Sequence, residues 1–176
     1  GLTQVRETLQ RNQGKISINS QLSKGTEVIL SFPRIKAPIW IAEEINLNPG
    51  DIVVVLDDDS SIHRAWGLRF EYIVKNIAYV QVEHFEVGDD AISFINALKP
   101  EQKEKVFMLT DYELLRQRLN GLEIVEQTSV NRSILVTSHY ANKDVRDHAA
   151  RIGTKILPKQ LASEIAIKVN CKQELK

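Results

Sequence analysis

Acidic side chains follow two apolar segments of the chain at the point where each segment ends. Asp57, Asp58 and Asp59 come directly after residues 52–56, and Asp111 comes directly after residues 106–110. Carboxylate oxygens gathered from two neighbouring strand ends form the kind of site that suits a hard divalent cation, above all Mg²⁺. A metal ion there would offset the repulsion between the carboxylates and would hold phosphoryl oxygens.

A hydroxyl and an ammonium group complete this set of polar residues. Thr137 ends the apolar run at 134–137, and Lys159 follows the run at 155–157. These two groups could bind the remaining oxygens of a transferred phosphoryl group. Each residue alone also has an ordinary structural explanation, because acids cap helices and threonine favours strands. Their shared position at one edge of one predicted sheet favours a functional site.

The elements that must position these residues are short apolar runs separated by helical periods. Runs typical of buried strands occupy residues 52–56, 78–85, 106–110, 134–137 and 155–157. Apolar residues at helical spacing follow each run, and the last such set is Leu161, Ile165 and Val169. Five strands alternating with five helices predict a doubly wound α/β fold around a parallel sheet. The ligand site of such a fold lies at the carboxyl ends of its strands.

The composition is that of an ordinary soluble globular protein. Of the 176 residues, 43% are hydrophobic and 26% charged, and 23 basic residues balance 23 acidic ones. This balance argues against a nucleic-acid surface spread over the whole molecule. No apolar run approaches the roughly 18–20 residues of a membrane helix. The polar N-terminus does not resemble a secretory signal, and the single cysteine, Cys171, excludes an internal disulfide. We expect a cytoplasmic chain with no nucleic-acid partner and no membrane contact.

The first third of the chain has a different character. Leu2, Val5 and Leu9 predict one helix that ends at Gly14, and two alternating segments around Gly25 predict a β-hairpin. A helix and one hairpin are too small to bury a core of their own. We therefore expect the apolar face of residues 1–34, with Ile39, Trp40 and Ile41, to fold against the following domain or to form a homodimer. The predicted parts are residues 1–34, a linker at 35–50, and a domain at 51–176.

Residues 51 to about 170 resemble a response-regulator receiver domain of two-component signalling. VVVLDDDSSI puts Asp57 and Asp58 at the acidic pair of that family, and VFMLTDYEL puts Asp111 at its phospho-accepting aspartate. LNGLEIV is similar to the Met-Asp-Gly stretch of the family and the helix after it. ILVTSHY and KILPKQ supply the family's hydroxyl residue as Thr137 and its lysine as Lys159.

The resemblance implies both a fold and a chemistry. The fold is the flavodoxin-like (βα)5 arrangement with strand order 2-1-3-4-5. The chemistry is transfer of a phosphoryl group from a phosphohistidine-bearing kinase or phosphotransfer protein onto Asp111. The family pattern implies that Asp58, Asp111 and the backbone carbonyl of Glu113 bind Mg²⁺ directly, and that Asp57 binds it through water. Asp59 then remains as a candidate for capping the following helix.

The chain departs from the receiver pattern near its lysine and after Asp111. Gln160 follows Lys159 where the family usually has proline, and Ile156 stands at the position of the family's switch aromatic. The stretch from Asp111 to Gly121 is two residues longer than usual.

The N-terminal residues carry a second resemblance, to the last part of a histidine-kinase ATPase domain. It rests on GLTQV, on GKI at residues 14–16 and on KGTEV at residues 24–28, with Gly1 as the last glycine of the ATP lid. Together the two resemblances imply the C-terminal part of a bacterial hybrid sensor histidine kinase. The ATP-binding segments are missing, so the chain should catalyse only its own aspartyl phosphorylation and dephosphorylation.

Two other functions fit part of the pattern. VVLDDDSS also resembles the start of a haloacid-dehalogenase-like phosphatase, with Asp57 as nucleophile, Asp59 as acid–base, and Thr137 and Lys159 in support. That fold needs a further acidic pair after the lysine, and no aspartate follows Lys159. The other alternative is a degenerate receiver that serves only as a docking module, although the complete residue set argues against it.

Overall fold

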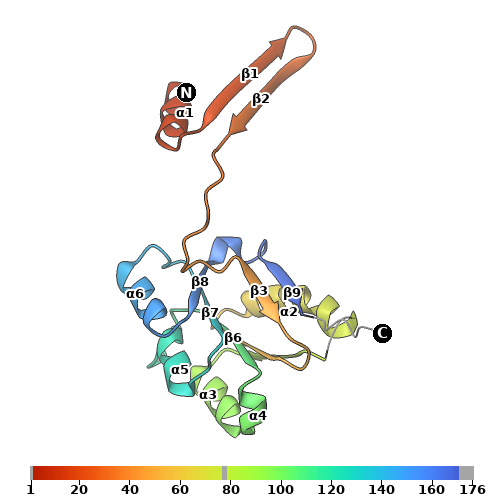
Figure 1. Cartoon of the computed structure of the whole chain (residues 1–176), viewed down its shortest axis with the longest axis vertical. Helices are drawn as coiled ribbons and strands as arrows, with labels where there is room; N and C mark the ends of the chain where they lie inside the picture. Colours follow the sequence, from red (N-terminus) through yellow and green to blue (C-terminus); the bar gives the residue numbers. More distant parts are fainter. Residues whose placement is uncertain (1, 77–78, 171–176) are drawn as a thin grey trace. The chain divides into compact units, whose positions relative to one another are not determined.

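The computed structural model of the chain describes residues 2–76 and 79–170, and it consists of two compact units (Figure 1). The N-terminal unit spans residues 1–37 and the sheet unit spans residues 38–176. Three residues used in the predictions above, Gly1, Ala78 and Cys171, lie outside the described part of the chain. In the part that is described, no helix is long and apolar enough to cross a membrane.

The N-terminal unit is a helix followed by a hairpin, as predicted. Its elements are α1 (Leu2–Arg11), β1 (Lys15–Gln21) and β2 (Gly25–Ser31). The two strands pair antiparallel, with Ile18 opposite Val28. Gly14 follows the turn between helix and hairpin, and a Cβ atom there would lie 2.9 Å from the Leu9 side chain and 3.1 Å from the carbonyl oxygen of Ser31. Glycine therefore favours close packing of the helix on the hairpin.

The sheet unit is built on five parallel strands, which confirms the predicted fold class. The strands are β4 (Ile52–Leu56), β5 (Gln81–Phe85), β6 (Val106–Thr110), β7 (Ser133–Thr137) and β8 (Lys155–Pro158). Their spatial order is β5-β4-β6-β7-β8, which is the predicted order 2-1-3-4-5. Every residue of β4 and β6 is buried because these central strands are covered on both faces.

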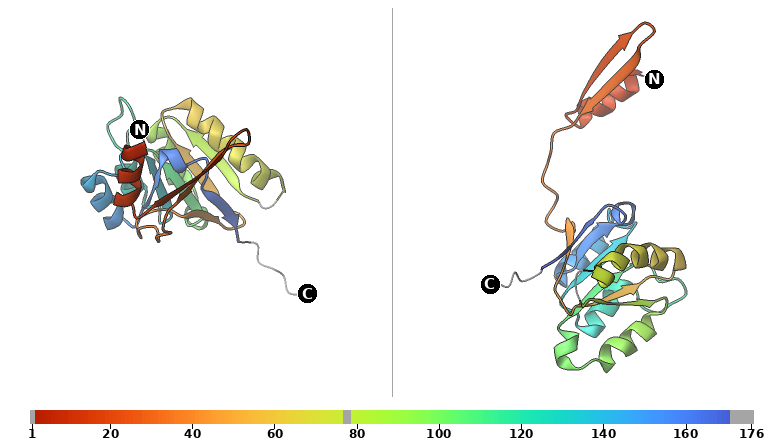
Figure 2. Two further views of the ribbon diagram at one scale, coloured as in Figure 1. Left: turned by 90° about the horizontal axis from the view of Figure 1, so that it is seen from above. Right: turned by 90° about the vertical axis from the view of Figure 1, so that its right-hand side faces the viewer.

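Helices cover the sheet from both sides (Figure 2). They are α2 (Ser60–Asn76), α3 (Gly88–Ala97), the short α4 (Pro100–Lys103), α5 (Gly121–Thr128) and α6 (Lys143–Arg151). Val53 of β4 packs with Trp66 and Phe70 of α2 on one face, whereas Val54 packs with Ile95 of α3 on the other. Alternate residues of a strand point to opposite faces, so this single strand joins two hydrophobic cores.

The predicted fifth helix is wrong. After β8 the chain makes a single 3₁₀ turn, η1 (Lys159–Leu161), and then a short strand, β9 (Ala166–Val169). β9 pairs in parallel with β3 (Glu44–Leu47), so that the start and the end of the sheet unit form one two-stranded ribbon. The Arg69 guanidinium of α2 donates to the carbonyls of Ala162 and Ile165. A side chain thus satisfies carbonyl groups that a helix would have satisfied internally.

The β3–β9 ribbon is part of the hydrophobic core. Ile45 and Leu47 of β3 are fully buried in the same core as Trp66 of α2. Burial of each of these two side chains contributes about 1.5–3 kcal/mol. Just before β3, the carbonyl of Trp40 accepts a 2.8 Å hydrogen bond from the amide of Ile156 in β8. Residues 40–47, which the sequence analysis assigned to a linker, therefore belong structurally to the sheet unit.

Candidate functional site

The candidate site lies at the carboxyl edge of the sheet, where three strands end in polar residues. Asp57 and Asp58 follow β4, Asp111 follows β6, and Lys159 follows β8. Backbone hydrogen bonds extend the sheet by one residue at this edge, because the amide of Asp111 donates to Leu56 at 2.9 Å. The parallel strands therefore bring residues that are about 50 positions apart in sequence to one place.

Asp57, Asp58 and Asp111 form an acidic cluster in which one carboxylate oxygen from each lies within 4.8 Å of the others. The residues Asp57 and Asp111 are 2% and 7% exposed, and Asp58 is half-buried. Gathering three carboxylates with so little water around them is unfavourable unless positive charge is close by.

Lys159 supplies positive charge to this cluster. Its Nζ atom lies 2.6 Å from Oδ2 of Asp111 and 3.1 Å from Oδ2 of Asp57. Burial alone would lower the pKa of Lys159, but the hydrogen bond to Asp111 and the two negative charges outweigh burial and raise the pKa. The ammonium group therefore stays charged and holds the two buried carboxylates together.

Each oxygen of the Asp111 carboxylate has its own hydrogen-bond donor, and the two contacts fix the orientation of the group. Oδ1 accepts a 2.6 Å hydrogen bond from the amide of Tyr112, and Oδ2 faces Lys159. Burial raises the pKa of Asp111 above its ordinary value, Lys159 opposes this shift, and the charge of Asp57 adds to it. A carboxylate with a raised pKa is a stronger base than an exposed aspartate, which favours attack on an electrophile.

Asp59, the third acid of the run, has a different environment. Its side chain is exposed, and Oδ1 accepts a 2.8 Å hydrogen bond from the amide of Ser61. A hydrogen bond with the Ser61 side chain, together with the one from the Ser61 amide, lowers the pKa of Asp59. The predicted capping role of Asp59 at the start of α2 is confirmed, and the acid lies outside the acidic cluster.

Thr137 is the last residue of β7, and Glu113 lies in the loop after β6. Thr137 is fully buried at the end of β7, and its hydroxyl oxygen accepts a 3.0 Å hydrogen bond from the amide of His139. Because the oxygen acts as acceptor in this contact, the hydroxyl proton is available to another acceptor. The Glu113 carboxylate lies 3.0 Å from Nε2 of the same histidine. His139 therefore links the loop after β6 to the loop after β7.

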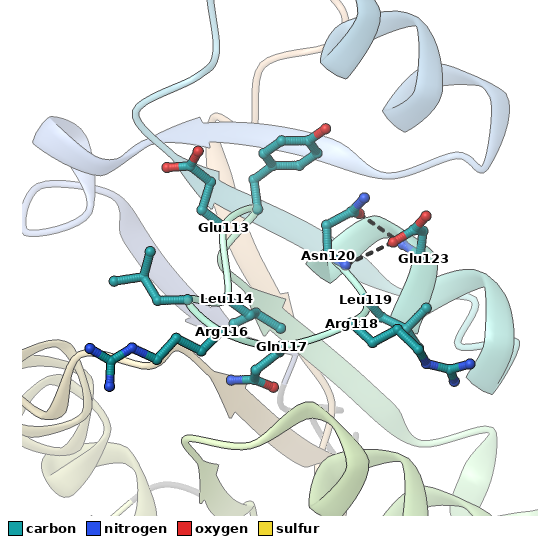
Figure 3. Close-up of a pocket in the computed structure, with 10 residues that line it drawn as sticks. Glu113, Leu114, Arg116, Gln117, Arg118, Leu119, Asn120 and Glu123 are labelled. Atoms are coloured by element: carbon teal, nitrogen blue, oxygen red, sulfur yellow. Dashed lines mark hydrogen bonds between the residues drawn. The ribbon is translucent and has the colours of Figure 1, made fainter.

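The loop that follows Asp111 lines a shallow, open pocket of about 330 Å³ (Figure 3). At its end, the Asn120 side chain accepts hydrogen bonds from the amides of Leu122 and Glu123 at 3.0 and 3.1 Å. The Glu123 carboxylate in turn accepts a hydrogen bond from the backbone N–H of Asn120 at 2.8 Å, and Figure 3 shows the side chains of the two residues facing each other. This capping box fixes the start of α5. Arg116 within the loop has a positive φ of 61°, which makes the tight bend.

Gly121, the first residue of α5, lies very close to the backbone of Asp111, the candidate nucleophile. A Cβ atom at Gly121 would lie 1.8 Å from the carbonyl oxygen of Asp111 and 2.4 Å from the hydroxyl of Thr110. Only a residue without a side chain lets α5 begin against the end of β6.

One contact at this edge was not predicted from the sequence. The side chains of His63 in α2 and His84 in β5 approach each other with 3.0 Å between their Nδ1 atoms. The two residues are 21 positions apart, on a helix and on a strand, and no short-range spacing marks them as a pair.

Comparison with known proteins finds similarity in structure only. The sequence matches no protein-family model and no curated protein. The fold is similar to a mutant of the receiver domain of the histidine kinase CKI1 from Arabidopsis thaliana, with a TM-score of 0.50 at 15% identity over 65% of this chain and 84% of that one. The receiver domain of the Francisella response regulator 1452 matches at 20% identity with a TM-score of 0.47, over 62% and 84% of the two chains. The response-regulator domain of Thermotoga maritima CheB matches at 23% identity with a TM-score of 0.46, over 64% and 81%.

These likenesses concern the architecture. The match to the CKI1 receiver domain shows that the chain has the fold of response-regulator receiver domains. The residues at the carboxyl edge of the sheet must carry any conclusion about chemistry, because a fold alone does not fix a function.

Proposed function

We propose that the sheet unit is a phosphoryl-accepting receiver domain, with Asp111 as the residue that takes the phosphoryl group. The observation that carries the proposal is the geometry around Asp111. One of its oxygens is fixed by the Tyr112 amide and the other by Lys159, beside two further carboxylates. This arrangement gives a nucleophile of fixed orientation next to positive charge, which is what phosphoryl transfer requires of a protein.

The donor set of the acidic cluster fits Mg²⁺. It offers oxygen atoms only, and Lys159 pairs with two of its three carboxylates, so the negative charge of the cluster exceeds the single positive charge beside it. In our proposal Asp58 and Asp111 hold the ion directly, Glu113 does so through its backbone carbonyl, and Asp57 does so through water. Bound Mg²⁺ supplies positive charge that neutralises a phosphoryl oxygen.

The chain's own residues divide the remaining work. An oxygen of Asp111 attacks the phosphorus atom of a phosphohistidine on the donor protein. The P–N bond breaks, and its electron pair stays on the imidazole nitrogen of the donor. The Thr137 hydroxyl donates a hydrogen bond to one phosphoryl oxygen, and the Lys159 ammonium turns from the Asp111 carboxylate to another. Both groups stabilise charge that the reaction concentrates at the acceptor.

The first test of this function is exposure of the purified full chain to acetyl phosphate with Mg²⁺, followed by intact mass measurement. We expect the mass to rise by one phosphoryl group when Mg²⁺ is present. We expect no rise when a chelator removes Mg²⁺ before acetyl phosphate is added. A chain that gains no phosphoryl group under these conditions, while it is folded and binds Mg²⁺, would instead be a docking module.

Replacing Asp58 by alanine should weaken Mg²⁺ binding by about tenfold or more, because the number of charged ligands sets the affinity of such sites. Titration calorimetry measures the affinity directly. Asp59→Ala is the matched control, since Asp59 binds the Ser61 amide and not the acidic cluster. The control should retain Mg²⁺ affinity and lose about 1 kcal/mol of stability with its helix cap. Undiminished Mg²⁺ binding by Asp58→Ala would contradict the proposed ligand set.

Lys159→Ala should still accept a phosphoryl group, but the conformational change that follows phosphorylation should be lost. Lys159 and Trp66 line the same pocket of about 390 Å³ beside α2, so movement of the lysine changes the surroundings of the indole. In a Trp40→Phe background, acetyl phosphate should change the Trp66 fluorescence, and Lys159→Ala should abolish this change.

Lys155→Ala serves as the control for Lys159, because Lys155 is an exposed lysine at the start of β8, the strand that Lys159 follows. It should keep both the phosphoryl group and the fluorescence change. A full fluorescence response in Lys159→Ala would show that the lysine does not transmit the signal.

We also propose that the N-terminal unit is the last part of a histidine-kinase ATPase domain, and that the whole chain comes from a cytoplasmic hybrid kinase. The helix, the glycine turn and the hairpin support this proposal. Val28, Leu30 and Phe32 are half or more exposed on and just after β2, which agrees with a surface that packs on a further domain or on a second copy of the chain.

A further inference from the structure

Two histidines meet at the edge of the sheet, outside the set of residues proposed to transfer the phosphoryl group. Nδ1 of His63 and Nδ1 of His84 are 3.0 Å apart, and their rings lie edge to face at an interplanar angle of 81°. β5, which carries His84, is an edge strand, and the His84 side chain is exposed while His63 is half-buried. Solvent therefore has access to the pair at His84, whereas His63 is partly covered by the protein.

The His63 ring is locked in one tautomer and one orientation. Its Nε2 atom lies 2.7 Å from the backbone carbonyl oxygen of Asp57. A carbonyl can only accept, so Nε2 carries the proton and Nδ1 of the neutral ring presents its lone pair toward His84. Histidines that bind metal ions typically donate their other ring N–H in this way to a backbone carbonyl, which fixes the ring.

His84 can supply the second nitrogen by a shift of one proton. In the metal-free pair Nδ1 of His84 carries the proton, because the lone pair of His63 Nδ1 accepts it at 3.0 Å. A metal ion bound between the rings would take the place of this proton on Nδ1, and the His84 ring would hold its proton on Nε2 instead, as neutral imidazole ligands do.

The spacing of the two nitrogens suits one shared ion. Two nitrogens bound to zinc at 2.0–2.1 Å with tetrahedral angles lie about 3.3 Å apart. The observed 3.0 Å needs only a small outward movement of His84, whose side chain is exposed on the edge strand.

We propose that His63 and His84 form a binding site for a borderline divalent transition metal such as Zn²⁺, bound through the two Nδ1 atoms with water in the remaining positions. The site is chemically distinct from the acidic cluster, because imidazole nitrogen favours Zn²⁺, Cu²⁺ and Ni²⁺ whereas carboxylate oxygen favours Mg²⁺. It is nevertheless linked to that cluster, since the ring that binds the metal also binds the backbone of Asp57. This inference does not require Asp111 to accept a phosphoryl group.

The test is calorimetric titration of Zn²⁺ into the full chain without an affinity tag, in the presence of excess Mg²⁺ to occupy the acidic cluster. The same titration with Co²⁺, followed by visible absorption, reports nitrogen coordination independently. We expect one equivalent of Zn²⁺ to bind, and His84→Gln and His63→Gln each to weaken binding by at least about tenfold. His148→Gln is the matched control, because His148 contacts Glu126 on another part of the sheet unit. It should bind Zn²⁺ as the parent chain does.

Three results would overturn the inference. They are no Zn²⁺ binding by the parent chain, unchanged binding in His84→Gln, and loss of binding in Asp58→Ala with the histidine variants unaffected. The last result would place the ion in the acidic cluster. Phosphoryl uptake by the same variants is measured separately by intact mass, so failure of the metal site and failure of the proposed function are distinguishable.

Discussion

Asp111→Asn should take up no phosphoryl group from acetyl phosphate and Mg²⁺, a loss on the order of 10³-fold or more. The amide has the shape of the carboxylate and can still accept the hydrogen bond from the Tyr112 amide, but it is not a nucleophile. Lys159 keeps Asp57 as a partner at 3.1 Å, so the site should remain assembled. Intact mass measures the uptake, and circular dichroism checks that the variant is folded.

An aspartate-to-asparagine change outside the site is the control, because it also removes one negative charge from the sheet unit. Asp147 pairs with Lys143 on the exposed face of α6, and Asp147→Asn should take up the phosphoryl group as the parent chain does. Peptide mapping then locates the label. A label on Asp57 in place of Asp111 would refute the receiver function and would favour the phosphatase-like chemistry.

Gly121→Ala should destabilise the sheet unit more than alanine at any other described glycine of that unit. The added Cβ atom would lie 1.8 Å from the carbonyl oxygen of Asp111, so either α5 or the end of β6 must move. Overpacking of this kind costs about 3 kcal/mol or more. The unfolding temperature should fall by about 6–12 °C for a unit of this size. The same displacement reaches the backbone of Asp111, so phosphoryl uptake should fall as well.

Gly67→Ala is the matched control for Gly121→Ala. Gly67 lies inside α2, and a Cβ atom there would meet no heavy atom within 4 Å. Alanine in place of glycine within a helix stabilises by about 0.5–1 kcal/mol, so Gly67→Ala should melt at or above the temperature of the parent chain. Equal unfolding temperatures for the two variants would mean that α5 can shift without cost.

The sequence was sufficient to predict the five-stranded sheet because its central strands, β4 and β6, are apolar runs and helical periods separate the strands. It also predicted which acids and which lysine meet at the edge, because parallel strands bring their carboxyl ends together. The geometry of Asp57, Asp58, Asp111 and Lys159 follows from this rule. Their roles in binding and transfer remain proposals that the variants above test.

The errors arose where structure depends on contacts between distant segments. Leu161, Ile165 and Val169 have helical spacing, yet a four-residue strand forms because β3 offers it a partner. Nothing near residue 166 in the sequence indicates that partner. The pair of His63 and His84 was missed for the same reason, since a helix and a strand must both be placed before the two rings meet.

The β3–β9 ribbon joins positions that are 122 residues apart in the chain, and this separation determines the order in which the sheet unit folds and opens. Closing so long a loop costs more entropy than pairing neighbouring strands, so we expect the ribbon to form after the five-stranded sheet and to open before it. Hydrogen exchange should therefore be faster at the amides of β9 than at those of β4, and equal rates would exclude separate opening. Trp40 and Ala42, just before β3, bond to Ile156 of β8 and not to β9, so opening of the ribbon would leave this attachment to the five-stranded sheet in place.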